Sequence, residues 1–77
     1  MPRYFFDTTD AGKTTRDDVG IDLADVEAAR KHVGKLLPNL ARNGLPDGEA
    51  HTFECDARNE AGTIVYHGEL TYRGSKL

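Results

Sequence analysis

The feature that most limits the fold is a single stretch with helical periodicity in the middle of the chain. From Leu23 onward, apolar residues recur every three or four positions, which places them on one side of a helix. They are Val26, Ala29, Val33, Leu36, Leu37 and Leu40. Extended segments joined by short turns lie on both sides of this stretch. A chain of 77 residues therefore has material for one helix and one sheet around one core.

The segment before the helix predicts a β-hairpin. Residues 3–8, RYFFDT, form a strand with aromatic side chains on both faces, and Phe5 lies alone on the second face. Residues 9–12 have the composition of a turn that ends in glycine, and the polar residues 13–17 form the returning strand. We expect this second strand to lie at an edge of the sheet.

The same hairpin contains Gly12-Lys13-Thr14, which is how a phosphate-binding P-loop ends. That loop needs a glycine five residues before Gly12, and Asp7 stands there instead. A carboxylate at this point would repel phosphate. We therefore reject a nucleotide site and keep the hairpin.

The boundaries of the helix follow from local signals. Asp25 is the expected N-cap, with Asp22 as the alternative. Pro38 lacks an N–H group, so the helix either ends near Leu37 or kinks there. A further short turn over residues 39–42 is expected.

A second hairpin follows a predicted loop at residues 45–48. Its turn is 59–62, NEAG, and we place Arg58 opposite Thr63. In this arrangement the apolar residues of both strands share the helix-facing side, because a slip of one residue would mix them with charged ones. They are Phe53, Cys55, Ala57, Ile64, Tyr66, Gly68 and Leu70.

These elements predict an α+β fold in a single small domain, residues 1–77. The order is β-β-α-β-β, with a four-stranded, mostly antiparallel sheet and one helix packed on one face. The order of strands in the sheet does not follow from the sequence.

Several groups of residues are of types that bind metal ions or catalyse reactions, but their spacing does not match such a site. Carboxylates cluster before and at the start of the helix, but strand termination and capping explain most of them, and whether they bind a cation stays open. They are Asp17, Asp18, Asp22, Asp25 and Glu27. His32, His51, His67 and Cys55 match no tight metal spacing, and Cys55 and His67 fall on opposite faces of the second hairpin. We expect no catalytic, cofactor-binding or metal-binding residue.

Charge and hydropathy exclude further classes. The net charge of −3 argues against a broad nucleic-acid surface, although the outer side of the helix is basic through Arg30, Lys31, Lys35 and Arg42. No segment has the length of a membrane span or the pattern of a signal peptide. A single unpaired cysteine fits a reducing compartment, so a cytoplasmic protein is expected.

Self-association is the strongest functional expectation. One helix covers one face of a sheet, whereas Phe5 and Val65 point toward the other face. An uncovered apolar patch on a small domain usually meets a partner. We therefore expect a homodimer, or contact with another protein, through the open sheet face or an edge strand, with Phe5 and Val65 at the interface.

Three stretches together resemble a known family: MPRYFFD at the start, DDVGIDLADVEAARKHVGKL, and FECDARNEAGTIVY. The chain is similar to short, uncharacterised bacterial proteins, frequent in alphaproteobacteria, that form a domain of unknown function. Relatives often carry a histidine where this chain has Asp7, and an aspartate where it has Asn59. The resemblance implies a fold and a bacterial background, and it transfers no site residue.

The expected function is thus a non-enzymatic binding or regulatory module that self-associates, without a cofactor, a membrane or an evident small-molecule substrate. The alternative is an antitoxin-like or nucleic-acid-binding regulator that uses the basic side of the helix.

Overall fold

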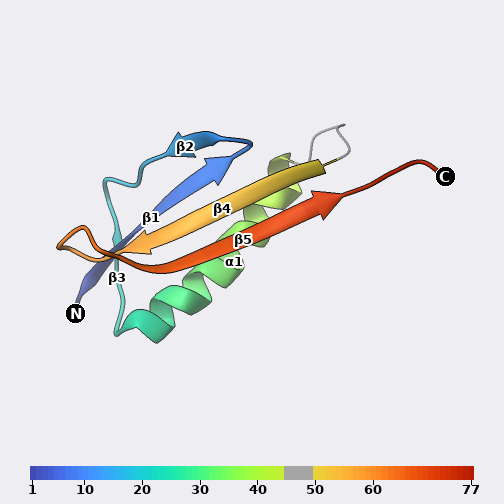
Figure 1. Cartoon of the computed structure of the whole chain (residues 1–77). Helices are drawn as coiled ribbons and strands as arrows, with labels where there is room; N and C mark the ends of the chain where they lie inside the picture. The colour runs from blue at the N-terminus through green and yellow to red at the C-terminus, as the bar shows by residue number, and fades with distance from the viewer. Residues whose placement is uncertain (45–49) are drawn as a thin grey trace.

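The molecule has two layers, an antiparallel sheet and one helix that crosses one of its faces (Figure 1). The computed structural model describes residues 1–44 and 50–77, so the predicted loop at 45–48 lies outside the described residues. In chain order the elements are β1 (Arg3–Asp10), β2 (Lys13–Thr15), β3 (Ile21–Asp22), α1 (Val26–Gly44), β4 (Ala50–Arg58) and β5 (Ile64–Arg73). The α+β class predicted from the sequence is confirmed.

The strand order is β2-β1-β4-β5, with β3 beside the first part of β1. Because β2 pairs with residues 8–10 of β1 and β3 pairs with residues 3–4, the two short strands share one edge of the sheet. The prediction of four strands omitted β3. A two-residue strand has no periodicity of its own, and its pairing partner lies far back in the sequence.

The first hairpin turns at Ala11 and Gly12, which both have positive φ (52° and 87°). Two such residues between paired strands are the usual two-residue hairpin connection. Asp10 and Lys13 face each other across the turn. The predicted hairpin is therefore confirmed, but β2 ends at Thr15, two residues earlier than expected.

Helix α1 begins with the predicted cap, since the backbone N–H of Ala28 donates to the Asp25 carboxylate (2.9 Å). The helix does not end at Leu37; it continues through Pro38 to Gly44. A proline inside a helix costs about 3 kcal/mol. Burial of Leu37 before it and packing of Leu40 after it offset this cost.

The second hairpin is closed by Asn59. Its side-chain oxygen accepts from the N–H groups of Ala61 (3.0 Å) and Thr63 (2.9 Å), and Gly62 supplies the positive φ. The predicted faces of β4 are correct, but Phe53 pairs with Leu70, two residues from the predicted register. Arg58 pairs with Ile64 and not with Thr63, which accounts for one residue, and a register shift at Ala57/Arg58, which the sequence does not reveal, adds the second. Ile64 is therefore opposite Arg58 and 56% exposed, and its expected place on the helix-facing side is wrong.

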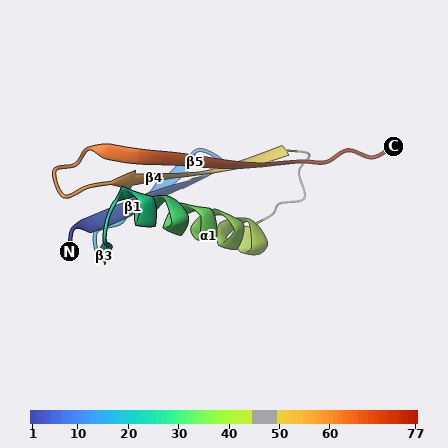
Figure 2. The same cartoon turned by 90° about the horizontal axis from the view of Figure 1, so that it is seen from below.

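The core lies between α1 and the centre of the sheet (Figure 2). Its buried members are Tyr4, Phe6, Ala29, Val33, Leu37, Phe53, Cys55 and Ala57. Helix α1 packs against β4 and β5, and its side chains come close to β5 at Gly68. A Cβ atom at Gly68 would lie 2.7 Å from Val33 Cγ1, so the glycine lets the helix come near.

Within residues 1–44 and 50–77, no helix combines the length and the apolar character needed to cross a membrane.

Candidate functional site

The outer edge of β5 is the longest uncovered strand edge. None of the described strands pairs with it, and its ten residues span about 33 Å. The opposite edge of the sheet consists of the three residues of β2 and the two of β3. Short, polar edge strands discourage pairing with other chains, whereas a long edge invites it.

A hollow of about 390 Å³ lies beside this edge, between β5 and α1. The strand contributes residues 66–70, and the helix contributes Val33, Gly34, Leu37 and Pro38. Gly68 is at the middle of the strand segment. The β5 edge and this hollow together, hereafter the edge site, offer both main-chain hydrogen-bonding groups and room for side chains.

The open face of the sheet, opposite the helix, carries a polar network around Asp7. Arg58 Nε donates to Asp7 Oδ2 (2.8 Å), and Arg58 Nη2 donates to the backbone oxygen of Asp17 (2.7 Å). The N–H of Asp17 in turn donates to Asp7 Oδ1 (2.8 Å). Asp17 also accepts from three backbone N–H groups, those of Phe6, Val19 and Gly20.

Burial raises the pKa of Asp7, but the hydrogen bond and charge of Arg58 outweigh it, so the net pKa lies below the usual value of 3.8. Burial also raises the pKa of Asp17, but hydrogen bonds from three backbone N–H groups outweigh this effect. The pKa of Asp17 therefore also lies below its usual value. The same contacts raise the pKa of Arg58. The network is therefore ionised at neutral pH and joins the 17–20 turn to the sheet.

This network changes the interpretation of Phe5. The Arg58 guanidinium carbon lies 4.6 Å from the centre of the Phe5 ring, and Gly20 packs against the ring edge. Phe5 is half-buried rather than uncovered. Val65 lies at the register shift and packs against the core. The expected apolar patch on the open face is therefore wrong, and an interface role for Phe5 and Val65 stays a prediction without that support.

A cluster of one histidine and three carboxylates, hereafter the His67 cluster, lies further along the open face. His67 Nδ1 is bonded to Asp56, while Nε2 lies 3.2 Å from Glu69 Oε1 and 3.8 Å from Glu54 Oε1. Hydrogen bonds with Asp56 and Glu69 raise the pKa of His67. The sequence alone did not reveal this cluster, because its two residues on β4 and its two on β5 come together only in the β4–β5 register.

The other residues that the sequence offered as metal ligands or nucleophiles lie in separate places. Cys55 is buried on the helix-facing side, opposite in direction to His67 as predicted, and burial raises its pKa to about 11. His51 is bonded to Asp10 and packs against Phe53. Three of the acidic residues before and at the start of the helix pair with a nearby arginine: Asp22 with Arg3, Asp18 with Arg16 and Glu27 with Arg30.

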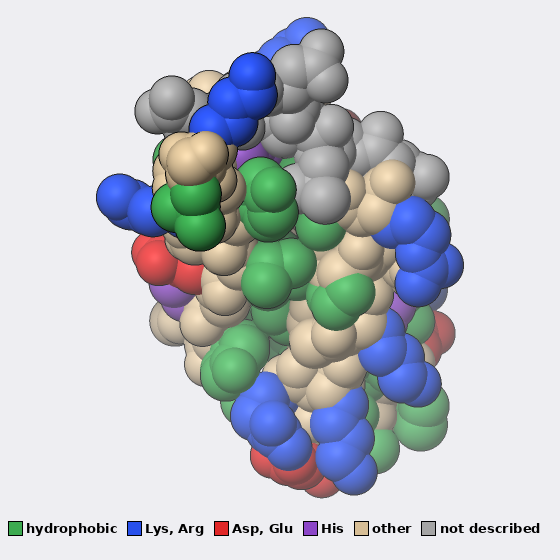
Figure 3. All heavy atoms as spheres, turned by 90° about the vertical axis from the view of Figure 1, so that its right-hand side faces the viewer, with side chains coloured by type: hydrophobic (Ala, Val, Ile, Leu, Met, Phe, Trp, Pro, Cys, Tyr) green, Lys and Arg blue, Asp and Glu red, His purple; other side chains and the backbone are tan. Residues whose placement is uncertain are grey.

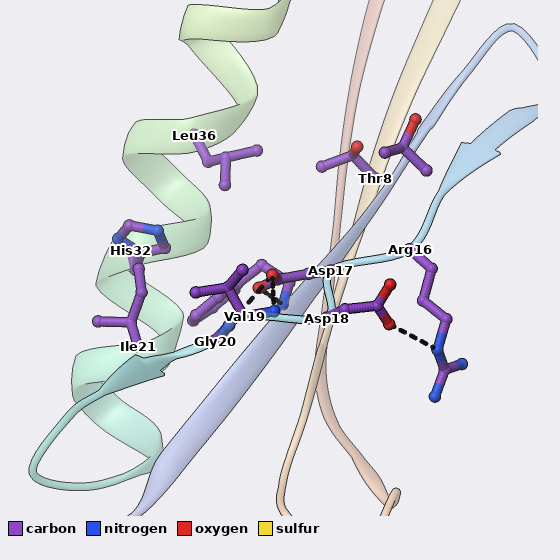
Figure 4. Close-up of a pocket in the computed structure, with 11 residues that line it drawn as sticks. Thr8, Arg16, Asp17, Asp18, Val19, Gly20, Ile21, His32 and Leu36 are labelled. Carbon is purple, nitrogen blue, oxygen red and sulfur yellow. Dashed lines mark hydrogen bonds and ion pairs between the residues drawn. The ribbon is translucent and has the colours of Figure 1, made fainter.

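A second, larger groove of about 610 Å³ lies between α1, β1 and the 16–21 segment (Figure 4). His32 and Leu36 project from the helix toward Val19 and Ile21. The His32 ring packs on Phe6 with centroids 4.4 Å apart. Since the Asp17 carboxylate in this groove is already occupied by backbone N–H groups, the groove offers mainly apolar contact.

Charged side chains of both signs are spread over the surface. In Figure 3 Lys and Arg side chains are visible at the top, left, right and bottom of the view, and Asp and Glu side chains at the left, bottom and right. Arg30, Lys31, Lys35 and Arg42 are exposed on α1, and Arg30 is paired with Glu27.

Fold and site together define a small α+β protein in which one helix crosses an antiparallel sheet with one protected and one uncovered edge. The chain belongs to the family described as domain of unknown function DUF6894, whose model matches residues 3–71. This agrees with the uncharacterised domain family expected from the sequence. Neither the curated proteins nor the solved structures contain a match.

Proposed function

We propose that this chain is a small, non-enzymatic binding or regulatory module that self-associates, and that two copies join by antiparallel pairing of their β5 strands at the edge site. In this proposal the protein acts in a bacterium, as the family resemblance implies, and in its cytoplasm, which the single unpaired cysteine favours. The occupant of the edge site is a second copy of the same chain.

The observation that carries the proposal is the contrast between the two sheet edges. The β2 and β3 edge is divided into pieces of three and two residues, whereas β5 presents ten residues in one run. Pairing of this edge would satisfy main-chain donors and acceptors along the whole strand. A two-fold arrangement would extend the sheet across both copies.

Charge complementarity favours one register. If the two-fold axis passes through Gly68, His67 of one copy faces Glu69 of the other, and Tyr66 faces Leu70. An axis through Glu69 would instead place two like charges opposite each other. The hollow beside Gly68 leaves room on the helix side for the second copy.

The two ends of β5 also suit this pairing. Ile64 is 56% exposed and Tyr72 is 45% exposed, so each end of the strand carries a large apolar side chain in water. Antiparallel pairing brings the beginning of one strand beside the end of the other. Both exposed side chains then gain a contact surface, which contributes favourable burial.

The non-enzymatic part of the proposal is supported by the state of Cys55. Its thiol is buried and has a pKa raised to about 11, so it is protonated at neutral pH. The thiolate, not the thiol, is the nucleophile.

Sedimentation velocity over a range of concentrations tests the proposal. The wild type is expected to sediment as a dimer, and Tyr72→Lys and Ile64→Lys are expected to shift it toward monomer, because each places a charge at the end of the paired strands. Val19→Lys is the matched control, since Val19 is 75% exposed and lies outside β5. It should leave the dimer unchanged.

A wild type that remains monomeric at the highest concentration would refute self-association. A dimer that Val19→Lys weakens and Tyr72→Lys leaves intact would place the interface elsewhere. Circular dichroism of each variant establishes that the fold is kept.

The exposed basic side chains of α1 support a second candidate function, contact with nucleic acid. Lys31, Lys35 and Arg42 are exposed on one helix. A gel-shift series at increasing salt tests it: binding that weakens with salt, and weakens further in Lys31→Ala/Lys35→Ala, is the expected result. Absence of binding at low salt would exclude this function.

A further inference from the structure

We propose that Glu54, His67 and Glu69 form a binding site for a divalent transition-metal ion of the zinc class on the open face of the sheet. The site consists of residues of one chain on β4 and β5, and it does not depend on self-association.

The ligand atoms already converge. One oxygen of Glu54, one oxygen of Glu69 and a ring nitrogen of His67 lie within 4.8 Å of one another, and no other group of three or more such residues does so in the described part of the chain. In a tetrahedral site with metal–ligand distances of 2.0–2.2 Å, ligand atoms lie about 3.3 Å apart. The distances from His67 Nε2, 3.2 Å to Glu69 and 3.8 Å to Glu54, are close to this value.

The histidine is oriented for ligation by a fourth residue. His67 Nδ1 is bonded to the carboxylate of Asp56, which lies directly opposite it on β4. This bond fixes the ring and directs Nε2 toward Glu54 and Glu69. A carboxylate that holds the distal nitrogen of a histidine is a regular feature of metal sites.

The electrostatics of the open face favour a bound cation. Glu54 and Glu69 are directly opposite each other in the β4–β5 register, and like charges in such positions destabilise a sheet. Asp56 is in turn opposite Asp7. Arg58 is engaged with Asp7 and the backbone of Asp17, and among the described contacts the His67 ring alone lies against the carboxylates of the cluster, so a divalent ion would relieve the repulsion further.

The ligand set selects the class of metal. Imidazole nitrogen suits zinc and its neighbours, whereas Ca²⁺ and Mg²⁺ prefer sites made of oxygen alone. Three protein ligands leave the fourth tetrahedral position to water. All three side chains are partly exposed, so an ion reaches them without a movement of the backbone.

Isothermal titration with ZnCl₂ tests the site on the full chain. We expect one zinc ion per chain in the wild type, and an affinity lower by at least about tenfold in Glu54→Gln, His67→Gln and Asp56→Asn. MgCl₂ should give no comparable binding. His51→Gln is the matched control, because His51 is also bonded to a carboxylate, that of Asp10, and within residues 1–44 and 50–77 no second carboxylate is bonded to it. Its affinity should equal that of the wild type.

Nuclear magnetic resonance locates the ion independently of affinity. Zinc should shift the His67 ring nitrogen signals and leave those of His32 and His51 in place. Tyr72→Lys, the variant expected to be monomeric, should bind zinc as the wild type does, so loss of the dimer and loss of the metal site give different results.

Three outcomes would overturn the proposal. The first is that the folded wild type shows no saturable binding of zinc. The second is that His51→Gln abolishes zinc binding while Glu54→Gln does not. The third is that zinc shifts only the ring signals of His32 or His51. Thermal unfolding of each variant in a chelator shows that weak binding is not a consequence of unfolding.

Discussion

Asp7 shows how one residue can link segments that are distant in the sequence. It lies on β1, pairs with Arg58 at the end of β4 and accepts from the backbone of Asp17 in the following turn. The side chains of Arg58 and Asp7 are only 11% and 17% exposed. The cost of burying these charges is offset only while every partner is present.

The lowered pKa values of Asp7 and Asp17 predict the pH dependence of stability. A carboxyl group with a folded pKa below its unfolded value of 3.8 contributes stability that is complete above that value. This contribution is lost as the pH falls through the folded pKa. We expect the part of the free energy of unfolding that Asp7 and Asp17 contribute, measured in urea, to be complete near neutral pH and to decrease below about pH 4.

Asp7→Asn tests whether the ionised Asp7 carboxylate stabilises the fold. The variant should lose about 2 kcal/mol at pH 7, because Arg58 loses a charged partner, and its stability should fall less steeply in acid. Asp18→Asn is the control, since Asp18 is 83% exposed and its ion pair with Arg16 should contribute little. If the free energy of unfolding fell equally steeply in acid for Asp7→Asn and the wild type, the acid dependence would not come from Asp7.

At the level of elements, the contact between α1 and β5 depends on a glycine. Gly68→Ala would place a methyl group 2.7 Å from Val33 Cγ1 and 3.1 Å from Leu37 Cδ1, which forces the helix and the strand apart. Overpacking of this kind costs about 1–3 kcal/mol. Gly34→Ala meets nothing within 4 Å beyond its own helix and should stabilise by about 0.5–1 kcal/mol.

Urea unfolding of both variants in the Tyr72→Lys background measures these effects without a contribution from pairing of β5. If Gly68→Ala were as stable as its parent, the proposed close approach of helix and strand would be wrong.

The elements that could be predicted from the sequence are those with local causes. The Asn59 turn, the Asp25 cap and the buried stripe through Ala29 and Val33 each depend on residues within one turn or a few helical turns. Of the two alternatives predicted at Pro38, an end of α1 near Leu37 is wrong, since the helix continues to Gly44. The penalty of Pro38 is local, whereas the packing of Leu37 and Leu40 that offsets it is tertiary.

At the level of the whole molecule, strand order and surface chemistry required the three-dimensional structure. Asp7 and Arg58 are 51 residues apart in the sequence, and no spacing rule connects them. The His67 cluster depends on the β4–β5 register, which differs by two residues from the predicted one. The edge site could not be located before the order β2-β1-β4-β5 was known.

The proposed function is association through a sheet edge. In the proposed dimer, β5 presents its outer edge to the second copy, and the same strand carries His67 and Glu69 on the open face. Self-association and zinc binding are separate claims, because Tyr72→Lys addresses the first and Glu54→Gln addresses the second.

Cross-linking of a double cysteine variant tests the central claim most directly. In the proposed register residues 67 and 69 of two copies are opposite each other, about 4.5–5.5 Å apart between Cα atoms, within the range of a disulfide. Native Cys55 is buried and should not interfere. Mild oxidation of His67→Cys/Glu69→Cys is predicted to give a covalent dimer on a non-reducing gel, with far less dimer from either single variant. A double variant that stays monomeric, or single variants that cross-link equally well, would contradict pairing of β5 about Gly68.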